Sequence, residues 1–144
     1  MIRHAGMIAR RVAGHWCGAL IEGPSGVGKS DLAFRALAEG FRLVSDDYAL
    51  VFASNGKLFG RAPDALAGLI EVRGLGVLPQ AHLSLCRVRL LVRCAIRPQA
   101  VERMPEPIFE TIEGVSVPVL DLWPLEPAAP GKIGRMFEHL GVTD

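Results

Sequence analysis

The sequence lacks any hydrophobic run long enough to cross a bilayer, which takes about 20 consecutive apolar residues, although half of its residues are hydrophobic. Residues 1–18 also lack the pattern of a secretory signal peptide. A chain of 144 residues is about one domain long and can bury a substantial core. We therefore expect a single soluble domain over residues 1–144, located in the cytoplasm and without a membrane partner.

An excess of charge of either sign is also missing, because 16 Lys and Arg residues face 15 Asp and Glu residues, for a net charge of +1. Proteins that bind nucleic acids usually carry a clustered basic face. The composition therefore argues against a nucleic-acid partner.

Cysteine is scarce, and the three residues Cys17, Cys86 and Cys94 are odd in number and lack the spacing of metal ligands. We expect buried, reduced thiols rather than a disulfide framework or a zinc site. Internal repeats and low-complexity segments are absent as well.

The most informative feature present is residues 23–30, which match the complete phosphate-loop (P-loop) pattern G-x-x-x-x-G-K-[ST]. In such a loop the backbone amides surround phosphate groups, Lys29 reaches the β and γ phosphates, and the Ser30 hydroxyl binds magnesium. A Gly-rich strand-to-helix turn without a nucleotide is the alternative. The predicted nucleotide-binding residues are Gly23, Pro24, Ser25, Gly26, Val27, Gly28, Lys29, Ser30 and Asp31.

The flanks of this loop agree with it, since residues 18–21 form an apolar strand pattern and residues 31–39 a helical one. Further strands are expected at 42–45, 48–53, 58–60 and 83–92, with an Asn-Gly hairpin turn at 54–57. A Pro-rich loop at 118–130 precedes a closing amphipathic helix. The fold class is therefore α/β: a P-loop nucleotide-binding domain with a mixed sheet, antiparallel hairpin additions and a C-terminal helix.

The strand expected at 83–92 alternates Arg87 and Arg89 with valine and leucine, and Arg93 continues the row. A solvated face is the simplest interpretation of this row. Contact with an acidic partner is the alternative.

Asp46 and Asp47 follow an apolar strand, where the ligand-binding residues of open α/β sheets gather. If the strand continues through them, their side chains point to opposite faces, and only one can face the phosphates. In nucleoside-triphosphatases such a carboxylate holds magnesium. Two acidic side chains facing solvent at a strand end are the alternative.

A second motif covers residues 69–77, Leu-Ile-Glu-Val-Arg-Gly-Leu-Gly-Val. Together with the P-loop and the Asp pair at these separations, it resembles the signature of bacterial HPr kinase/phosphorylase, a family whose pattern is close to E-I-R-G-L-G-I. The resemblance runs from about His4 to about Leu140. It corresponds to the catalytic domain alone, so the N-terminal domain of the longer members is expected to be missing.

The resemblance implies phosphorylation, dependent on ATP and Mg²⁺, of a serine on HPr or an HPr-like phosphocarrier protein of the phosphotransferase system. It also implies the reverse reaction, in which inorganic phosphate releases the phosphoryl group as pyrophosphate, and a homo-hexamer. A small-molecule P-loop kinase or other nucleotide hydrolase, and a nucleotide-binding sensor, are the rival functions. The small-molecule kinase or hydrolase would not need the 71–76 segment, whose glycines suggest close backbone approach. The missing domain and the altered mobile loop suggest the sensor.

Residue roles follow from the same resemblance. Lys29 corresponds to the phosphate-binding lysine, while Ser30 and Glu71 correspond to magnesium ligands. Asp46 matches the residue that takes the proton from the acceptor serine and also serves the metal, with Asp47 as a neighbour that tunes it. Arg103 matches an arginine that stabilises charge on the transferring group.

The family's active-site histidine corresponds to His4, but more residues than usual separate it from the P-loop. Either the hairpin between them is longer, or His15 takes the position instead. Tyr48 stands where longer members commonly have arginine. The family's mobile loop, used in phosphorolysis, corresponds to a segment containing Pro127, Pro130, Gly131 and Lys132.

Overall fold

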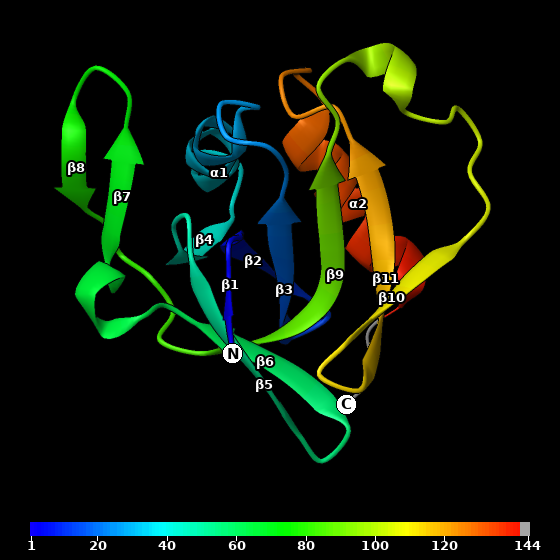
Figure 1. Cartoon of the computed structure of the whole chain (residues 1–144), viewed down its shortest axis with the longest axis horizontal. Helices are drawn as coiled ribbons and strands as arrows, with labels where there is room; N and C mark the ends of the chain where they lie inside the picture. The colour runs from blue at the N-terminus through cyan, green and yellow to red at the C-terminus, as the bar shows by residue number, and fades with distance from the viewer. Residues whose placement is uncertain (142–144) are drawn as a thin grey trace.

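The computed structural model describes residues 1–141 and contains one nine-stranded mixed sheet, a separate two-stranded hairpin and two α-helices within that range (Figure 1). In chain order the elements are β1 (Ile2–Arg3), β2 (Gly6–Val12), β3 (His15–Glu22), α1 (Lys29–Leu37), β4 (Arg42–Ser45), β5 (Ala49–Ser54), β6 (Lys57–Arg61), the 3-10 turn η1 (Asp64–Leu66), β7 (Leu69–Val72), β8 (Gly76–Pro79), β9 (Cys86–Cys94), the 3-10 turn η2 (Pro98–Ala100), β10 (Ile108–Ile112), β11 (Val115–Leu122) and α2 (Ala129–Leu140).

The sheet is built around the parallel strands β3, β9 and β11. Along one path the strand order is β1-β5-β6-β9-β3-β2-β4, and β11 with its antiparallel partner β10 joins β9 outside this path. The first residues of β9 pair with β6 and its last residues with β11. This mixed topology confirms the predicted α/β class, and it gathers the carboxyl ends of β3, β9 and β11 at one edge, next to the P-loop.

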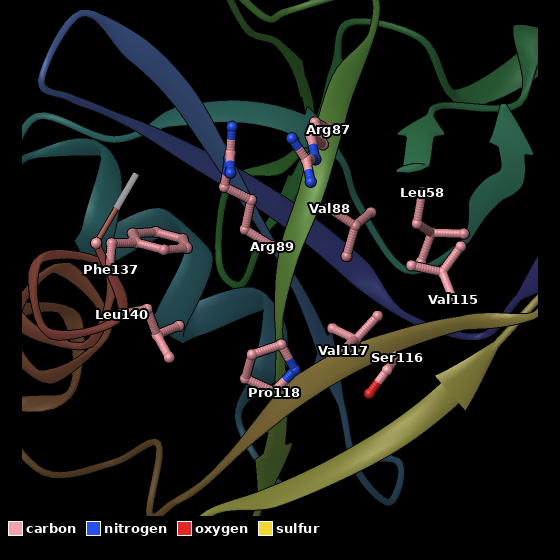
Figure 2. A pocket seen from close by; sticks show the side chains of 11 residues that line it. Leu58, Arg87, Val88, Arg89, Val115, Ser116, Val117, Pro118, Phe137 and Leu140 are labelled. Carbon is pink, nitrogen blue, oxygen red and sulfur yellow. The ribbon is translucent and has the colours of Figure 1, made fainter. Parts of the chain in front are cut away.

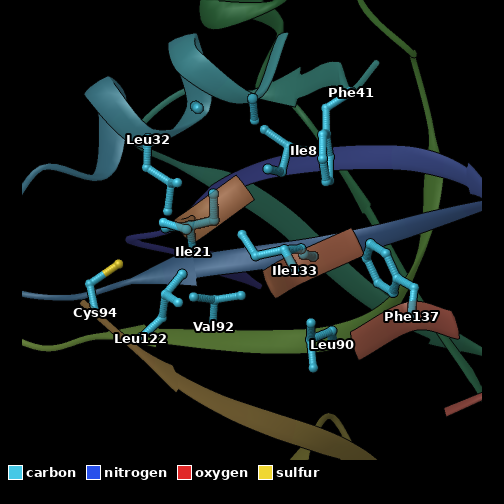
Figure 3. Close-up of a cluster of buried hydrophobic side chains, with 14 of the residues drawn as sticks. Ile8, Ile21, Leu32, Phe41, Leu90, Val92, Cys94, Leu122, Ile133 and Phe137 are labelled. Carbon is cyan, nitrogen blue, oxygen red and sulfur yellow. The ribbon is translucent and has the colours of Figure 1, made fainter. Parts of the chain in front are cut away.

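Both helices pack on one face of the sheet, and β5, β6, β10 and β11 contribute to the core on the other. Figure 3 shows the helical side, where Leu32 of α1 and Ile133 and Phe137 of α2 meet side chains of the strands. Ile8, Ile21, Leu90 and Val92 supply the sheet side of this cluster. Close packing here fixes the position of α1, and therefore of the P-loop that begins it.

The hairpin predictions are confirmed, and one of them has a consequence for the site. Asn55 and Gly56 take φ angles of 52° and 73° in the β5–β6 turn, as an Asn-Gly hairpin requires. β2 and β3 form a second hairpin, with Val12 opposite His15. The many residues between His4 and the P-loop therefore belong to one long antiparallel pair of strands.

The Pro-rich segment was wrongly predicted to be a loop throughout residues 118–130. Pro118 lies within β11, one residue before the parallel pairing with β9 begins at Val119, so no hydrogen bond of that parallel ladder is lost there. Pro130 lies in the first turn of α2, a position where a missing N–H is tolerated. The expected strand at 83–92 begins later, at Cys86.

No helix within residues 1–141 is long and apolar enough to cross a membrane.

Candidate active site

The P-loop connects β3 to α1, as the sequence predicts, and its glycines take left-handed backbone conformations. Gly26 and Gly28 have φ angles of 79° and 115°. The Lys29 ammonium curls back over the loop and donates to the carbonyl oxygens of Gly23 and Pro24 at 2.6 and 3.1 Å. The loop therefore presents its lysine and the N-terminus of α1 to the same space, which suits an anionic ligand.

Asp46 ties the P-loop helix to the β7–β8 hairpin. The Ser30 hydroxyl donates to Oδ1 of Asp46 at 3.0 Å, and the backbone N–H of Glu71 donates to Oδ2 at 2.9 Å. The Glu71 side chain is exposed on the same short strand. A hydroxyl and carboxylates are the oxygen ligands that magnesium prefers.

A magnesium ion would therefore be held mainly by Ser30 and Asp46, with Glu71 next to them. Among residues 1–141 no group of three or more His, Cys, Asp and Glu side chains is arranged to hold a metal by itself. Magnesium in phosphate sites commonly takes one or two protein carboxylates and completes its coordination with substrate phosphates and water.

His4 and Asp47 form a second pair, with His4 Nε2 and Asp47 Oδ1 2.9 Å apart. Each residue is the middle of a three-residue turn. The Ala5 N–H donates to the Arg3 carbonyl at 2.9 Å, and the Tyr48 N–H donates to the Asp46 carbonyl at 2.7 Å. Asp47 has a φ of 66°, a conformation that is uncommon for residues other than glycine and that aspartate tolerates better than most.

The ring of Tyr48 stacks on the imidazole of His4, with centroids 4.8 Å apart and an interplanar angle of 21°. The side chains of His4 and Asp47 remain 45% and 54% exposed. The pair is thus held in place and still open to a large partner. His15, in contrast, begins β3 at the end remote from the P-loop, whereas His4 lies beside Asp47.

Other predicted site residues lie elsewhere. Arg103 is exposed on the long connection between β9 and β10, which Figure 1 shows along the opposite edge of the molecule from the β7–β8 hairpin. Pro130, Gly131 and Lys132 belong to the first turn of α2, and Lys132 forms an ion pair with Glu126, so the loop predicted there is wrong for these three residues. Pro127 lies in the turn before the helix.

The glycines of the 71–76 segment also have a different explanation. Gly74 and Gly76 adopt φ angles of 89° and 98° in the β7–β8 turn, and a Cβ atom at either position would meet nothing within 4 Å. Turn geometry, not close backbone approach within this chain, therefore accounts for them. The hairpin is attached through Ile70 and Val72, which pack on Leu43.

No pattern in the sequence indicated the salt-bridge network around Arg3. Arg3 Nη2 donates to Glu22 Oε1 at 3.0 Å and to Glu110 Oε2 at 2.8 Å. Glu22 could have been noticed because it directly precedes the P-loop, but Glu110 is 107 residues from Arg3 and no local pattern connects them.

Comparisons with known proteins agree on one family. The family model described as HPr Serine kinase C-terminal domain matches residues 5–83. An HPr kinase/phosphorylase of Leptothrix cholodnii is 37% identical over 112 residues, 69% of this chain and 34% of that protein. One from Clostridium beijerinckii is 46% identical over 61 residues, 42% of this chain and 20% of that protein.

The matched regions thus span about a third or less of these two relatives. The solved structure of the Hpr(Ser) kinase/phosphatase from Coxiella burnetii shares the fold, with a TM-score of 0.80 and 23% identity over 97% of this chain and 90% of that one. Since the family model covers more than half of the sequence, the chain belongs to the family of the HPr Serine kinase C-terminal domain.

Proposed function

We propose that this chain transfers the γ-phosphoryl group of ATP to a serine hydroxyl of HPr or an HPr-like phosphocarrier protein. The observation that supports this most directly is the adjacency of two units. Ser30, the last residue of the P-loop, is hydrogen-bonded to Asp46. The next residue, Asp47, is paired with His4. The first unit suits a nucleotide with its metal, and the second suits a hydroxyl that must lose a proton.

In the donor unit, the loop amides and Lys29 bind and orient the phosphates, and Ser30, Asp46 and Glu71 would hold Mg²⁺. When bound, the ion would neutralise negative charge on the phosphates. Both carboxylate oxygens of Asp46 already accept hydrogen bonds, from the Ser30 hydroxyl and the Glu71 N–H. We therefore assign Asp46 to the metal, the second of the two roles that the sequence suggests for it.

In the acceptor unit, we assign the proton to Asp47 rather than to Asp46. Asp47 takes the proton of the serine hydroxyl while the bond between the serine oxygen and the γ-phosphorus forms and the bond to the β,γ-bridging oxygen breaks, releasing ADP. His4 keeps the carboxylate oriented through its 2.9 Å contact. In the reverse reaction, inorganic phosphate attacks the phosphoserine, pyrophosphate forms, and Asp47 returns the proton to the serine oxygen.

Incubation with ATP labelled at the γ-phosphate and an HPr-like carrier tests the proposal. Label on a carrier serine is the expected result. Free labelled phosphate alone would indicate a nucleotide hydrolase, and bound but unchanged ATP a nucleotide sensor. Addition of inorganic phosphate to the phosphorylated carrier should yield pyrophosphate if the reverse reaction is also present.

Arg103 and a homo-hexamer remain proposals carried by the family resemblance. Because Arg103 lies on an exposed connection, a role for it requires that this segment approach the phosphates when substrate binds, or that Arg103 act on a neighbouring subunit. Light scattering of the purified protein measures the mass of the assembly directly.

A further inference from the structure

The two residues of the His4–Asp47 pair are held in corresponding ways. Each lies in the middle of a three-residue turn, and the residue before each one carries an anchored charged side chain. Asp46, before Asp47, accepts hydrogen bonds from the P-loop helix and the β7–β8 hairpin. Arg3, before His4, donates to two carboxylates instead.

One of those carboxylates lies directly beside the P-loop. Glu22 is the last residue of β3, immediately before Gly23, whose carbonyl accepts the hydrogen bond from Lys29. Glu110 lies on β10. Through Glu22, Arg3 connects the segment that carries His4 directly to the strand that leads into the P-loop.

The Arg3–Glu22 contact is well suited to fixing a position. Both nitrogens Nε and Nη2 of Arg3 bond to the Glu22 carboxylate, and the two side chains are only 19% and 23% exposed. A two-point contact with limited solvent access restrains orientation more than a single exposed ion pair does. The hydrogen bond to Glu22 raises the pKa of Arg3, burial opposes that rise, and Glu110 adds to it.

The backbone holds this segment over a short length only, where Met1 and Val51 exchange two hydrogen bonds beside β1. β1 consists of two residues and pairs with β5 alone, at an end of the strand order. We propose that Arg3 is a positioning residue for phosphoryl transfer, which through Glu22 and Glu110 sets the place of His4, and with it the orientation of Asp47, relative to the P-loop. This inference rests on the function proposed above.

The test is Arg3→Gln, which removes the charge and keeps most of the length. Small misplacements of reacting groups cost up to about 10²-fold in rate, so we expect kcat for carrier phosphorylation to fall by about tenfold or more, with KM for ATP unchanged. The matched control is Arg135→Gln, which removes an exposed ion pair with Glu138 on α2 and leaves Arg3 and its two carboxylates untouched. Exposed pairs contribute little, so that variant should keep its kcat within about twofold.

Two further variants separate positioning from general damage. Glu22→Gln should lower kcat in the same direction, and the double variant should lose little more than Arg3→Gln alone, because Arg3→Gln already removes the contact with Glu22. Arg3→Lys, which keeps the charge, should recover part of the activity. An additive double variant, or a KM for ATP that rises as much as kcat falls, would overturn the inference.

Hydrogen exchange gives a readout that does not depend on activity. The Ala5 amide, buried and bonded to the Arg3 carbonyl, should exchange faster in Arg3→Gln than in the parent protein, whereas amides of α1 should not. Unchanged exchange at Ala5 contradicts the anchoring whether or not a carrier is phosphorylated. If the parent protein phosphorylates no carrier while Ala5 responds as expected, the proposed function fails and the anchor stands.

Discussion

The donor and acceptor halves of the candidate site are stabilised in different ways. Most of the donor half is one continuous segment, residues 23–30, whose shape is set by glycine conformations and by bonds from Lys29 to its own loop. Asp46 and Glu71 join this segment through hydrogen bonds to Asp46. The acceptor half depends on contacts between distant segments. His4 and Asp47, 43 residues apart, meet through their side chains, and Arg3 of β1 bonds to Glu22 of β3 and Glu110 of β10. Such a contact network can be altered at one point without unfolding the loop, so the two halves should fail separately when mutated.

The largest separation of the two halves is expected from Asp47→Asn. Asparagine tolerates the left-handed conformation at this position but accepts no proton, so transfer should fall by about 10²- to 10⁴-fold while nucleotide binding persists. Kinetics with labelled ATP, alongside calorimetric nucleotide binding, measure both quantities.

Asp46→Asn is the matched comparison, one residue away. It should raise the magnesium concentration needed for half-maximal activity, because it removes one charge from the proposed metal site. Full transfer by Asp47→Asn, together with complete loss of transfer in Asp46→Asn at saturating magnesium, would show that Asp46 is the proton acceptor.

Lys29→Ala is expected to damage the donor half and leave the acceptor half intact. Removal of a charge aimed at the transferring group typically costs about 10²- to 10³-fold in rate, and here nucleotide affinity should fall too. Calorimetry measures the affinity, and NMR signals of the His4 ring report on the acceptor half. A change at His4 as large as that in Asp47→Asn would show that the halves are not separate.

A smaller effect is expected from the ring of Tyr48. Stacked aromatic pairs are worth about 0.5–1.5 kcal/mol, so Tyr48→Leu should lower kcat by about two- to tenfold, whereas Tyr48→Phe keeps the stack on His4 and should match the parent protein. Equal activity of all three proteins would show that the Tyr48 ring does not help to position His4.

Thiol reagents should have the smallest effect on transfer. Burial raises the pKa of Cys94 to about 11 and of Cys86 to about 12, so both thiols stay protonated at neutral pH, and only the thiolate reacts. Iodoacetamide at pH 7.5 should leave activity unchanged, and labelling should accelerate as the pH rises toward these values. Mass spectrometry measures the rate of labelling. Rapid labelling of Cys94 would mean that the strand next to the P-loop opens more readily than the packing suggests.

The difference between the halves also explains what the sequence could predict. The strand-loop-helix unit around the P-loop and the Asn-Gly hairpin are local patterns, because each conformation depends on adjacent residues, and both conformations were predicted correctly. Pro118 was misplaced because tolerance of a proline in a strand depends on which neighbour its missing N–H would face. The Arg3 contacts depend on β1, β3 and β10 meeting at one edge, which only the tertiary structure establishes.

The β2–β3 hairpin lies in the sequence between His4 and the P-loop, yet its tip, Ala13 and Gly14, is remote from both. Residues added in pairs at this tip would lengthen two antiparallel strands and leave the ends of those strands in register. The site therefore places no fixed limit on the number of residues between its histidine and its phosphate loop. For protein engineering, the tip is a place where a reporter peptide can be inserted into the middle of an active-site sequence without entering the active site.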